Sequence, residues 1–232
     1  MTSKHADSRP TAGGLPAARL RLIRLSVAAA LAFLAGFVTF LLVAWNDAGS
    51  PGLADYLSEL GAPNTPGAGP YRLAVLCVAA AAALVALAWR LRAPALSAAA
   101  YLALGAAMFV VSAAVPCAAG CPIPIRDGLS TLPNFVHFSV SGLAFALAIG
   151  AMLSAGSADV EPRLRRVSSA AAGAAVVLYG ILAGLMFVFG HGLANGLVER
   201  TLAVVCLTWL AWAAVRLCRQ SLVSEAFGQP PP

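Results

Sequence analysis

Six long stretches without a charged residue constrain the fold of this chain more than any other feature. They cover residues 25–46, 73–89, 93–125, 128–158, 167–198 and 201–215. A helix that crosses a bilayer needs roughly 20 apolar residues. The second and last stretches are shorter, but an arginine at one end of each has a long side chain that reaches the lipid headgroups. The pattern therefore predicts six membrane-spanning helices, and a four-span bundle is the alternative.

The composition agrees with a bilayer as the solvent. Hydrophobic residues make up 60% of the 232 residues and charged residues 10%, whereas soluble domains are about 25% charged. We expect an all-α, polytopic integral membrane bundle at residues 19–219, with a disordered tail at 1–18 and a second tail at 220–232. The spans are predicted at about 23–46, 71–90, 95–115, 132–154, 167–190 and 198–217.

The basic residues predict which way the bundle faces. With six spans, twelve of the fifteen lysines and arginines fall on one side of the membrane. Basic residues accumulate on the cytoplasmic side of short loops, so both termini and both tails are predicted to be cytoplasmic. We interpret the net charge of +6 as a topology signal that faces anionic lipid. Membrane lipids are thus expected partners, and nucleic acid is not.

Three loops are then predicted on the outer side, at residues 47–70, 116–132 and 190–199. Within the first, the run ADYLSELGA at 54–62 is expected to form a short interfacial helix that lies on the bundle. Tyr56, Leu57 and Leu60 fall on one face of that helix.

Cys117 and Cys121 share the second outer loop. In the oxidising space outside a bacterial inner membrane, disulfides persist, and a turn of this length brings the two sulfurs together. A disulfide that fixes the loop shape is the first interpretation. A zinc site with His137 and His191 is a second, with Asp127 and Glu59 as further candidate ligands. A catalytic redox pair is a third, although such pairs usually have two intervening residues rather than three.

Polar residues gather near the predicted outer ends of the last three spans. Asn134, His137 and Ser141 recur at helical spacing and should face the bundle, because exposing them to lipid is costly. His191 ends the fifth span, and Glu199 and Arg200 open the sixth. One interpretation is a set of hydrogen bonds that lock the helices together. The other is a polar pocket, open to the outside, that holds a headgroup or small molecule. The candidate ligand-binding residues are Glu59, Arg126, Asn134, His137, Ser141, His191, Glu199 and Arg200.

Gly180 and Gly184 have the GxxxG spacing that favours close packing of helices, within the chain or between chains. This face is the candidate contact for a homo-oligomer.

Several segments resemble a bacterial family of six-helix membrane proteins called domain of unknown function 998. They are DYLSELGAPNTPGAGPYR after the first span, the Pro/Cys loop with its following histidine, and GLVERTLAVVCLTWLAWAAVRL at the last span. The resemblance covers roughly residues 22–218. It implies six helices, a bacterial inner membrane location and a distant likeness to eukaryotic Frag1/DRAM-like membrane proteins. It points to Ser58, Glu59, His137 and Arg200, and it implies no activity.

Three functions remain open at this stage. The first is an uncharacterised membrane protein that binds a lipid or small amphiphile in the outer polar pocket. The second is a membrane enzyme or redox protein that uses His137 and His191 as metal, haem or acid/base groups. The third is a structural or assembly partner. No cofactor is predicted, and haem or a metal ion at the two histidines is the alternative.

Overall fold

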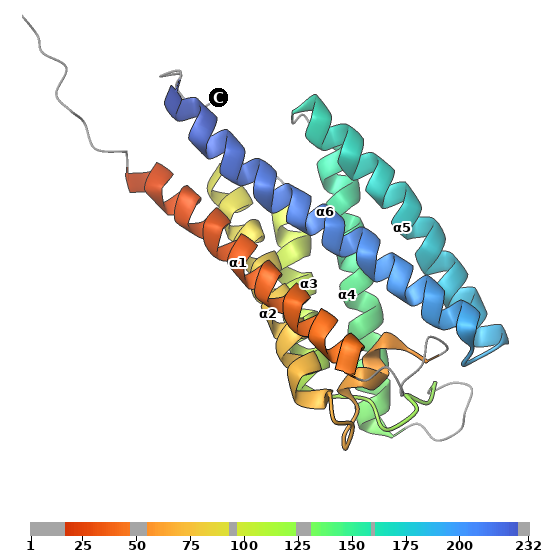
Figure 1. Cartoon of the computed structure of the whole chain (residues 1–232). Helices are drawn as coiled ribbons and strands as arrows, with labels where there is room; N and C mark the ends of the chain where they lie inside the picture. The colour runs from red at the N-terminus through yellow and green to blue at the C-terminus, as the bar shows by residue number, and fades with distance from the viewer. Residues whose placement is uncertain (1–16, 47–54, 93–96, 124–130, 159–160, 227–232) are drawn as a thin grey trace, which may run out of the picture.

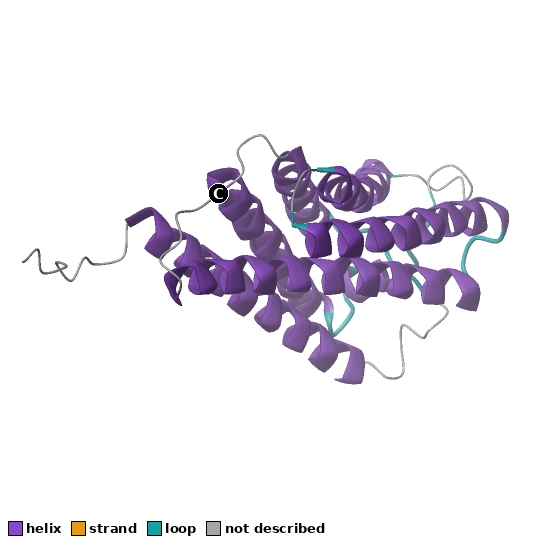
Figure 2. Cartoon of the chain, turned by 90° about the horizontal axis from the view of Figure 1, so that it is seen from above, coloured by secondary structure: helices purple, strands orange, loops and turns teal. Residues whose placement is uncertain are grey.

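The computed structural model describes residues 17–46, 55–92, 97–123, 131–158 and 161–226, and every regular element within these residues is a helix (Figure 2). Six helices are long and apolar enough to cross a membrane, as predicted. In chain order the elements are α1 (Ala17–Asn46), η1 (Leu57–Gly61), α2 (Ala68–Arg92), α3 (Ser97–Ala114), α4 (Leu132–Ser157), α5 (Pro162–Val188) and α6 (Leu193–Ala226).

The helices extend past the predicted spans at several ends. The first helix begins at Ala17, inside the predicted tail, and the last one continues to Ala226 rather than ending near residue 217. Alanine, leucine and arginine are strong helix formers, so a helix continues beyond the apolar stretch into the flanking basic residues. The remaining parts of the predicted tails, 1–16 and 227–232, lie outside the described residues.

The six helices form a closed ring. Each helix packs against the next one in the chain, and α6 returns to pack against α1. Helices that are not neighbours in the ring contact each other far less, mainly through α2 with α6 and α4 with α6. A ring of this kind leaves space at its centre unless long side chains from several helices fill it.

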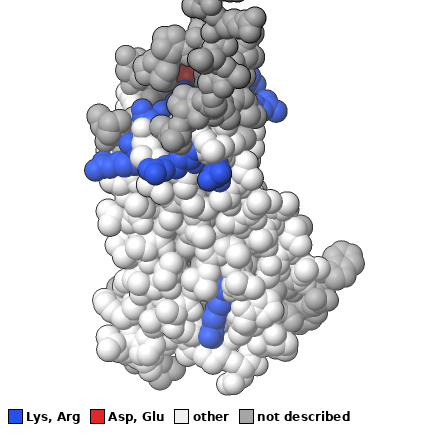
Figure 3. Space-filling view, turned by 90° about the vertical axis from the view of Figure 1, so that its left-hand side faces the viewer, with Lys and Arg blue, Asp and Glu red and all other residues white. Residues whose placement is uncertain are grey.

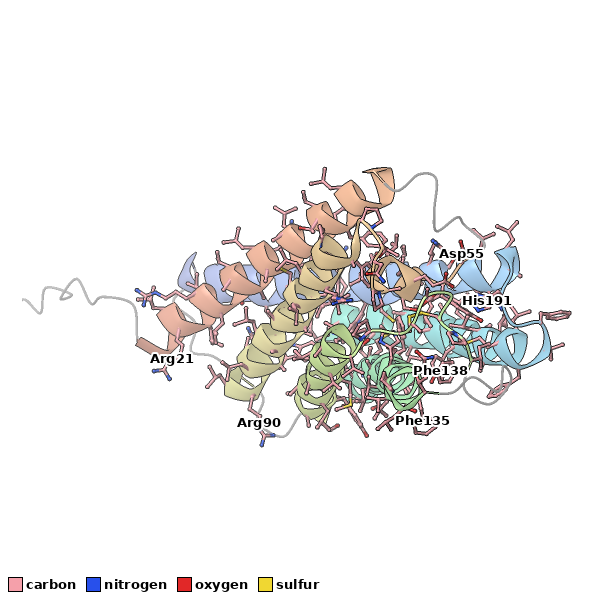
Figure 4. The ribbon with its side chains drawn as sticks, turned by 90° about the horizontal axis from the view of Figure 1, so that it is seen from below. Arg21, Asp55, Arg90, Phe135, Phe138 and His191 are labelled. Atoms are coloured by element: carbon pink, nitrogen blue, oxygen red, sulfur yellow. A yellow bond between two sulfur atoms is a disulfide. The ribbon has the colours of Figure 1, made fainter. Side chains whose placement is uncertain are left out.

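The two ends of the bundle differ in charge. Arg21 and Arg90 lie at one end, which we call the arginine end, and Asp55 and His191 lie at the other, the loop end (Figure 4). A band of basic side chains crosses the surface near the arginine end, and a broad uncharged surface adjoins it (Figure 3). The exposed arginines near that end of the helices are Arg21, Arg24, Arg90, Arg92, Arg163, Arg165, Arg166 and Arg219.

The surface between the two ends is apolar. Leu31, Val177 and Val204 are 62%, 60% and 61% exposed, although each lies in the middle of a long helix. A soluble protein rarely exposes contiguous apolar surface of this kind. The exposed leucines and valines thus fit a lipid environment, in agreement with the predicted fold class.

The half of the ring near the arginine end is tightly packed. Alanines from all six helices pack with Trp89 and Trp209, whose ring centroids lie 5.8 Å apart. Trp209 also donates a hydrogen bond from Nε1 to the Ser168 hydroxyl at 3.0 Å. Small side chains allow the helices to approach closely here, so the centre of the ring is filled in this half.

Gly36 provides a test of the close packing between α1 and α2, the neighbouring pair of helices that it joins. A Cβ atom at Gly36 would lie 2.9 Å from the Ala74 carbonyl oxygen and 3.0 Å from Cys77 Cβ, so Gly36→Ala forces α1 away from α2. We expect the free energy of unfolding in detergent to fall by about 1–3 kcal/mol.

The matched control is Gly180→Ala, because a Cβ there meets nothing within 4 Å. Alanine is the better helix former, so this variant should be unchanged or more stable by up to about 1 kcal/mol. Equal losses in both variants would contradict the packing described for α1 and α2.

Candidate functional site

A cavity of about 670 Å³ occupies the centre of the ring. All six helices and η1 contribute to its wall. It extends from Tyr56 and Cys121 at the loop end to Trp209 and Leu210, where the packed half begins. This volume is within the range of about 300–1,000 Å³ that is typical of small-molecule sites.

The wall of the cavity is mostly apolar. Its aromatic side chains include Phe33, Phe37, Phe109 and Phe145, and the last two meet edge to face with their centroids 5.9 Å apart. Alanines and leucines cover much of the remaining wall. An apolar cavity does not hold ordered water well, so its chemistry suits a hydrocarbon chain.

The cavity reaches the outer surface of the bundle between α1 and α6. These two helices lie close together near the arginine end and diverge toward the loop end (Figure 1). Phe37 on α1 and Val204 on α6 both belong to the cavity wall, and they are 42% and 61% exposed. Val204 shares its helix face with the exposed Leu197 and Thr201. The opening therefore faces sideways, toward the apolar surroundings of the bundle.

The 3-10 helix η1 covers the loop end of the cavity. Tyr56 precedes it and is 3% exposed, and Leu60 within it is 4% exposed. The predicted short helix at 54–62 is thus present as five residues, with Leu60 buried in the bundle and Leu57 half-buried. Whether η1 also lies at a membrane interface stays a prediction.

Polar side chains of α6 hold η1 in place. The Glu199 carboxylate accepts a hydrogen bond from the Leu57 backbone N–H at 2.6 Å, and the Arg200 guanidinium donates to the Asp55 carbonyl at 2.8 Å. The Tyr56 hydroxyl donates to the Gly190 carbonyl at 3.1 Å. Backbone groups outside regular helices need such partners when they lie in apolar surroundings.

A second set of contacts joins η1 to α2. The Arg72 guanidinium donates two hydrogen bonds to the Gly61 carbonyl, from Nε at 3.0 Å and from Nη2 at 2.8 Å. Gly61 lies so close to Tyr71 that a Cβ atom would be 2.7 Å from the ring. The glycine in the run SELGA is therefore required by the close approach of the tyrosine.

The second loop covers the cavity beside η1, and it contains the predicted disulfide. Cys117 and Cys121 are bonded, with their Cα atoms 5.1 Å apart, and both belong to the cavity wall. Gly120 has a φ of +76°, which allows the tight turn between them. The Ser58 hydroxyl of η1 lies 3.4 Å from Cys121 Sγ, so the two covering segments touch.

Two residues of the predicted polar stripe on α4 hold this loop. The Asn134 side-chain oxygen accepts from the Ala118 N–H at 2.7 Å, and His137 Nδ1 lies 2.8 Å from the Val115 carbonyl oxygen. The third, Ser141, bonds the Ser112 hydroxyl at 2.8 Å. Asn134, His137 and Ser141 all contribute to the cavity wall, so the stripe faces the bundle as expected.

Glu59 and His191 lie outside the cavity wall. His191 Nδ1 is 3.3 Å from a carboxylate oxygen of Glu59, and the His191 ring contacts the Tyr56 ring edge to face at 4.7 Å. The structure thus separates these two from Glu199 and Arg200, which do belong to the wall. The eighth predicted ligand-binding residue, Arg126, lies outside the described residues.

The histidines do not share a wall of the cavity. His137 contacts it, whereas His191 pairs with Glu59 at the α5–α6 corner. Among the described residues no group of three histidine, cysteine or acidic side chains is arranged to hold a metal ion. Haem or a metal at His137 and His191 stays a prediction that no contact in the described residues supports.

Sequence reasoning missed several residues of the site. Ser112 on α3 and Asn195 on α6 are buried polar residues, at 8% and 1% exposed. The Asn195 amide donates to the Tyr56 hydroxyl at 3.4 Å. Each is a single polar residue in an apolar stretch. This is a weaker signal than the stripe on α4, where polar residues recur at helical spacing.

Gly180 and Gly184 make no close contact within the chain, since a Cβ atom at either would meet nothing within 4 Å. Their faces are exposed. The spacing therefore does not serve packing inside the bundle, and a contact between two copies of the chain stays a prediction.

The partly buried carboxyl group of Glu59 should make the stability of the fold depend on pH. Burial raises the pKa of Glu59 above its ordinary value and Asp55 adds to this, whereas the Tyr56 N–H, His191 and Arg200 act in the opposite direction. The unfolded chain therefore releases this proton at lower pH than the folded chain. This contribution to stability is present below the ordinary glutamate pKa of about 4.3 and is lost as pH rises through the folded value.

We compare the free energy of unfolding of Glu59→Gln with that of the chain that keeps Glu59. The difference should change in favour of Glu59→Gln as pH is raised from about 4 to about 6. Both chains should carry His191→Gln, so that the contact between His191 and the Glu59 carboxylate does not contribute. Thermal unfolding in detergent at several pH values measures the difference. A difference in unfolding temperature that stays constant with pH, or that changes in favour of the chain with Glu59, would contradict the buried setting of Glu59.

Comparison with known proteins identifies a family for this chain. Neither the curated proteins nor the solved structures give a match. The sequence does match the family described as "Protein of unknown function (DUF998)" over residues 26–216, which includes four of the six candidate spans whole and most of the first and the last. This chain belongs to that family.

Proposed function

We propose that this membrane protein binds a lipid or other small amphiphile, with the apolar part of the ligand in the central cavity. The observation that carries this proposal is the sideways opening between α1 and α6, where Phe37 and Val204 belong to the cavity wall and are also exposed. A ligand dissolved in the bilayer would enter there without passing through water.

The distribution of polar groups in the wall supports one orientation of the ligand. Asn134, His137, Ser141, Glu199 and Arg200 lie toward the loop end, whereas Trp209 and Leu210 lie toward the packed half. A polar head would lie near the first group, and the chain would run toward the tryptophan. The proposed ligand site therefore includes the predicted polar residues that belong to the cavity wall, and it does not include Glu59 and His191.

The proposal includes a location. We infer that the bundle lies in a bacterial inner membrane with both termini in the cytoplasm and the loop end outside. The band of arginines at the opposite end supports this orientation, because basic residues are retained on the cytoplasmic side. A disulfide at the loop end fits an oxidising compartment.

Filling the cavity tests the binding proposal. Ala106 on α3 is 5% exposed and belongs to the cavity wall, so Ala106→Phe places a ring in the space that the chain of the ligand would occupy. We expect binding of a radiolabelled fatty-chain probe to the purified protein to weaken roughly tenfold, which corresponds to about 1.4 kcal/mol.

The neighbouring residue supplies the control. Ala107 is exposed on the outer face of α3, so Ala107→Phe adds the same ring outside the cavity. This variant should bind like the parent protein. The proposal fails if Ala106→Phe binds as well as Ala107→Phe while both proteins unfold at similar temperatures.

Labelling tests the orientation separately. Ala194 at the loop end and Ser157 at the far end of α4 are both exposed. In intact cells, a membrane-impermeant maleimide should modify Ala194→Cys, and it should modify Ser157→Cys only after the cells are permeabilised. The reverse pattern would show that the loop end faces the cytoplasm.

A further inference from the structure

The two ring nitrogens of His137 have different surroundings. Nδ1 lies 2.8 Å from the Val115 carbonyl oxygen and 3.2 Å from the Ser112 carbonyl oxygen. A carbonyl oxygen only accepts hydrogen bonds, so Nδ1 carries a proton and donates. In the neutral ring, Nε2 then holds a lone pair and acts as an acceptor.

This acceptor has no partner. Nε2 of His137 is buried and makes no hydrogen bond in the described part of the chain. Buried acceptors without a partner are rare, because each one loses its hydrogen bond to water and gains nothing in return. The His137 side chain is 8% exposed and belongs to the wall of the cavity. A ligand in the cavity is therefore well placed to supply the missing donor.

A polar contact is also what a membrane ligand requires. A hydrocarbon chain gains little on moving from the bilayer into an apolar cavity, since lipid tails are as apolar as leucine. Selective binding must then come from shape and from hydrogen bonds that the bilayer interior does not offer. The unpartnered nitrogen of His137 offers such a bond.

The other polar groups of the wall favour an uncharged head. The Glu199 carboxylate and the Arg200 guanidinium both hold backbone atoms of the segment that covers the cavity. Near His137, the wall offers the hydroxyls of Ser112 and Ser141, which bond each other at 2.8 Å. A hydroxyl head fits these neighbours, whereas a phosphate or carboxylate would place a second acceptor against Nε2.

We propose that the cavity selects a long-chain, uncharged amphiphile whose hydroxyl donates a hydrogen bond to Nε2 of His137. This inference depends on the proposed function, because it names the chemical class of the ligand in the same cavity. Nε2 has less than 1 Å² of accessible surface, so the hydroxyl reaches it after a shift of neighbouring side chains. Rotamer changes of this kind are common on binding.

The test uses the full chain, purified in detergent, and three probes with the same chain length. They are hexadecanol, its methyl ether and hexadecanoate, each competing with radiolabelled hexadecanol. The ether keeps the oxygen and removes the donor. Hexadecanol should bind roughly tenfold more tightly than the ether, as expected for one hydrogen bond to a buried group, and more tightly than hexadecanoate. Diacylglycerol and polyprenol in further competition arms distinguish the natural sources of such a hydroxyl.

The variant His137→Asn distinguishes the roles of the two ring nitrogens of His137. An asparagine amide can occupy the position of Nδ1 and keep the bond to the Val115 carbonyl, but it has no atom at the position of Nε2. This variant should bind the ether as the parent does and lose the roughly tenfold preference for the alcohol. Ser139→Ala, on the exposed face of the same helix, should keep the preference.

The outcomes separate this inference from the proposed function. If the parent protein binds hexadecanol and the ether equally, the cavity binds chains and the inference about the head is wrong. The same conclusion follows if His137→Asn keeps the preference. If no probe binds and Ala106→Phe behaves like its control, the proposed function is itself wrong.

Discussion

The backbone polar groups of η1 and of the disulfide loop need hydrogen-bond partners, because both segments lie at the end of an apolar bundle. The rest of the structure depends on this requirement. A backbone outside a regular helix cannot satisfy its own polar groups, and a lipid environment offers no water to do so. Glu199 and Arg200 bind the segment that begins at Asp55, and Asn134 and His137 bind the loop of Cys117. These side chains, all near the loop ends of their helices, keep the ring covered at that end. The cavity exists because the cover is attached to the rim of the ring rather than packed into its centre.

The two halves of the ring differ because their side chains differ. Alanines near the arginine end let the helices approach until Trp89 and Trp209 fill the centre. Toward the loop end, α1 and α6 diverge, and phenylalanines such as Phe37 line the space without closing it. A single bundle thus combines a rigid base with a hollow half that opens sideways. This arrangement suits a ligand that already resides in the membrane.

The number and order of the spans could be predicted because each apolar stretch is long enough to cross a bilayer by itself. The inward-facing stripe of Asn134, His137 and Ser141 was also predictable, since its helical period is local. The pairing of Glu59 with His191 was not, because it depends on how the Tyr56 segment folds back against the α5–α6 corner. The cavity could not be predicted either, since the distance between opposite helices is a property of the whole ring. Sequence reasoning left two interpretations of the polar groups, one pocket or a set of hydrogen bonds between helices. The structure distributes these groups between the cavity wall and the segments that cover it.

The central claim is that a hydrocarbon chain lies inside the ring. Photocrosslinking with a fatty alcohol that carries a diazirine in mid-chain tests it most directly, with the modified residues located by peptide mass spectrometry. Phe145 belongs to the cavity wall, whereas Phe135 on the same helix is 53% exposed on the outside (Figure 4). The account predicts adducts on the segments around Phe109 and Phe145, and their loss when unlabelled alcohol is added in excess. Adducts confined to outward-facing residues, unaffected by competition, would contradict it.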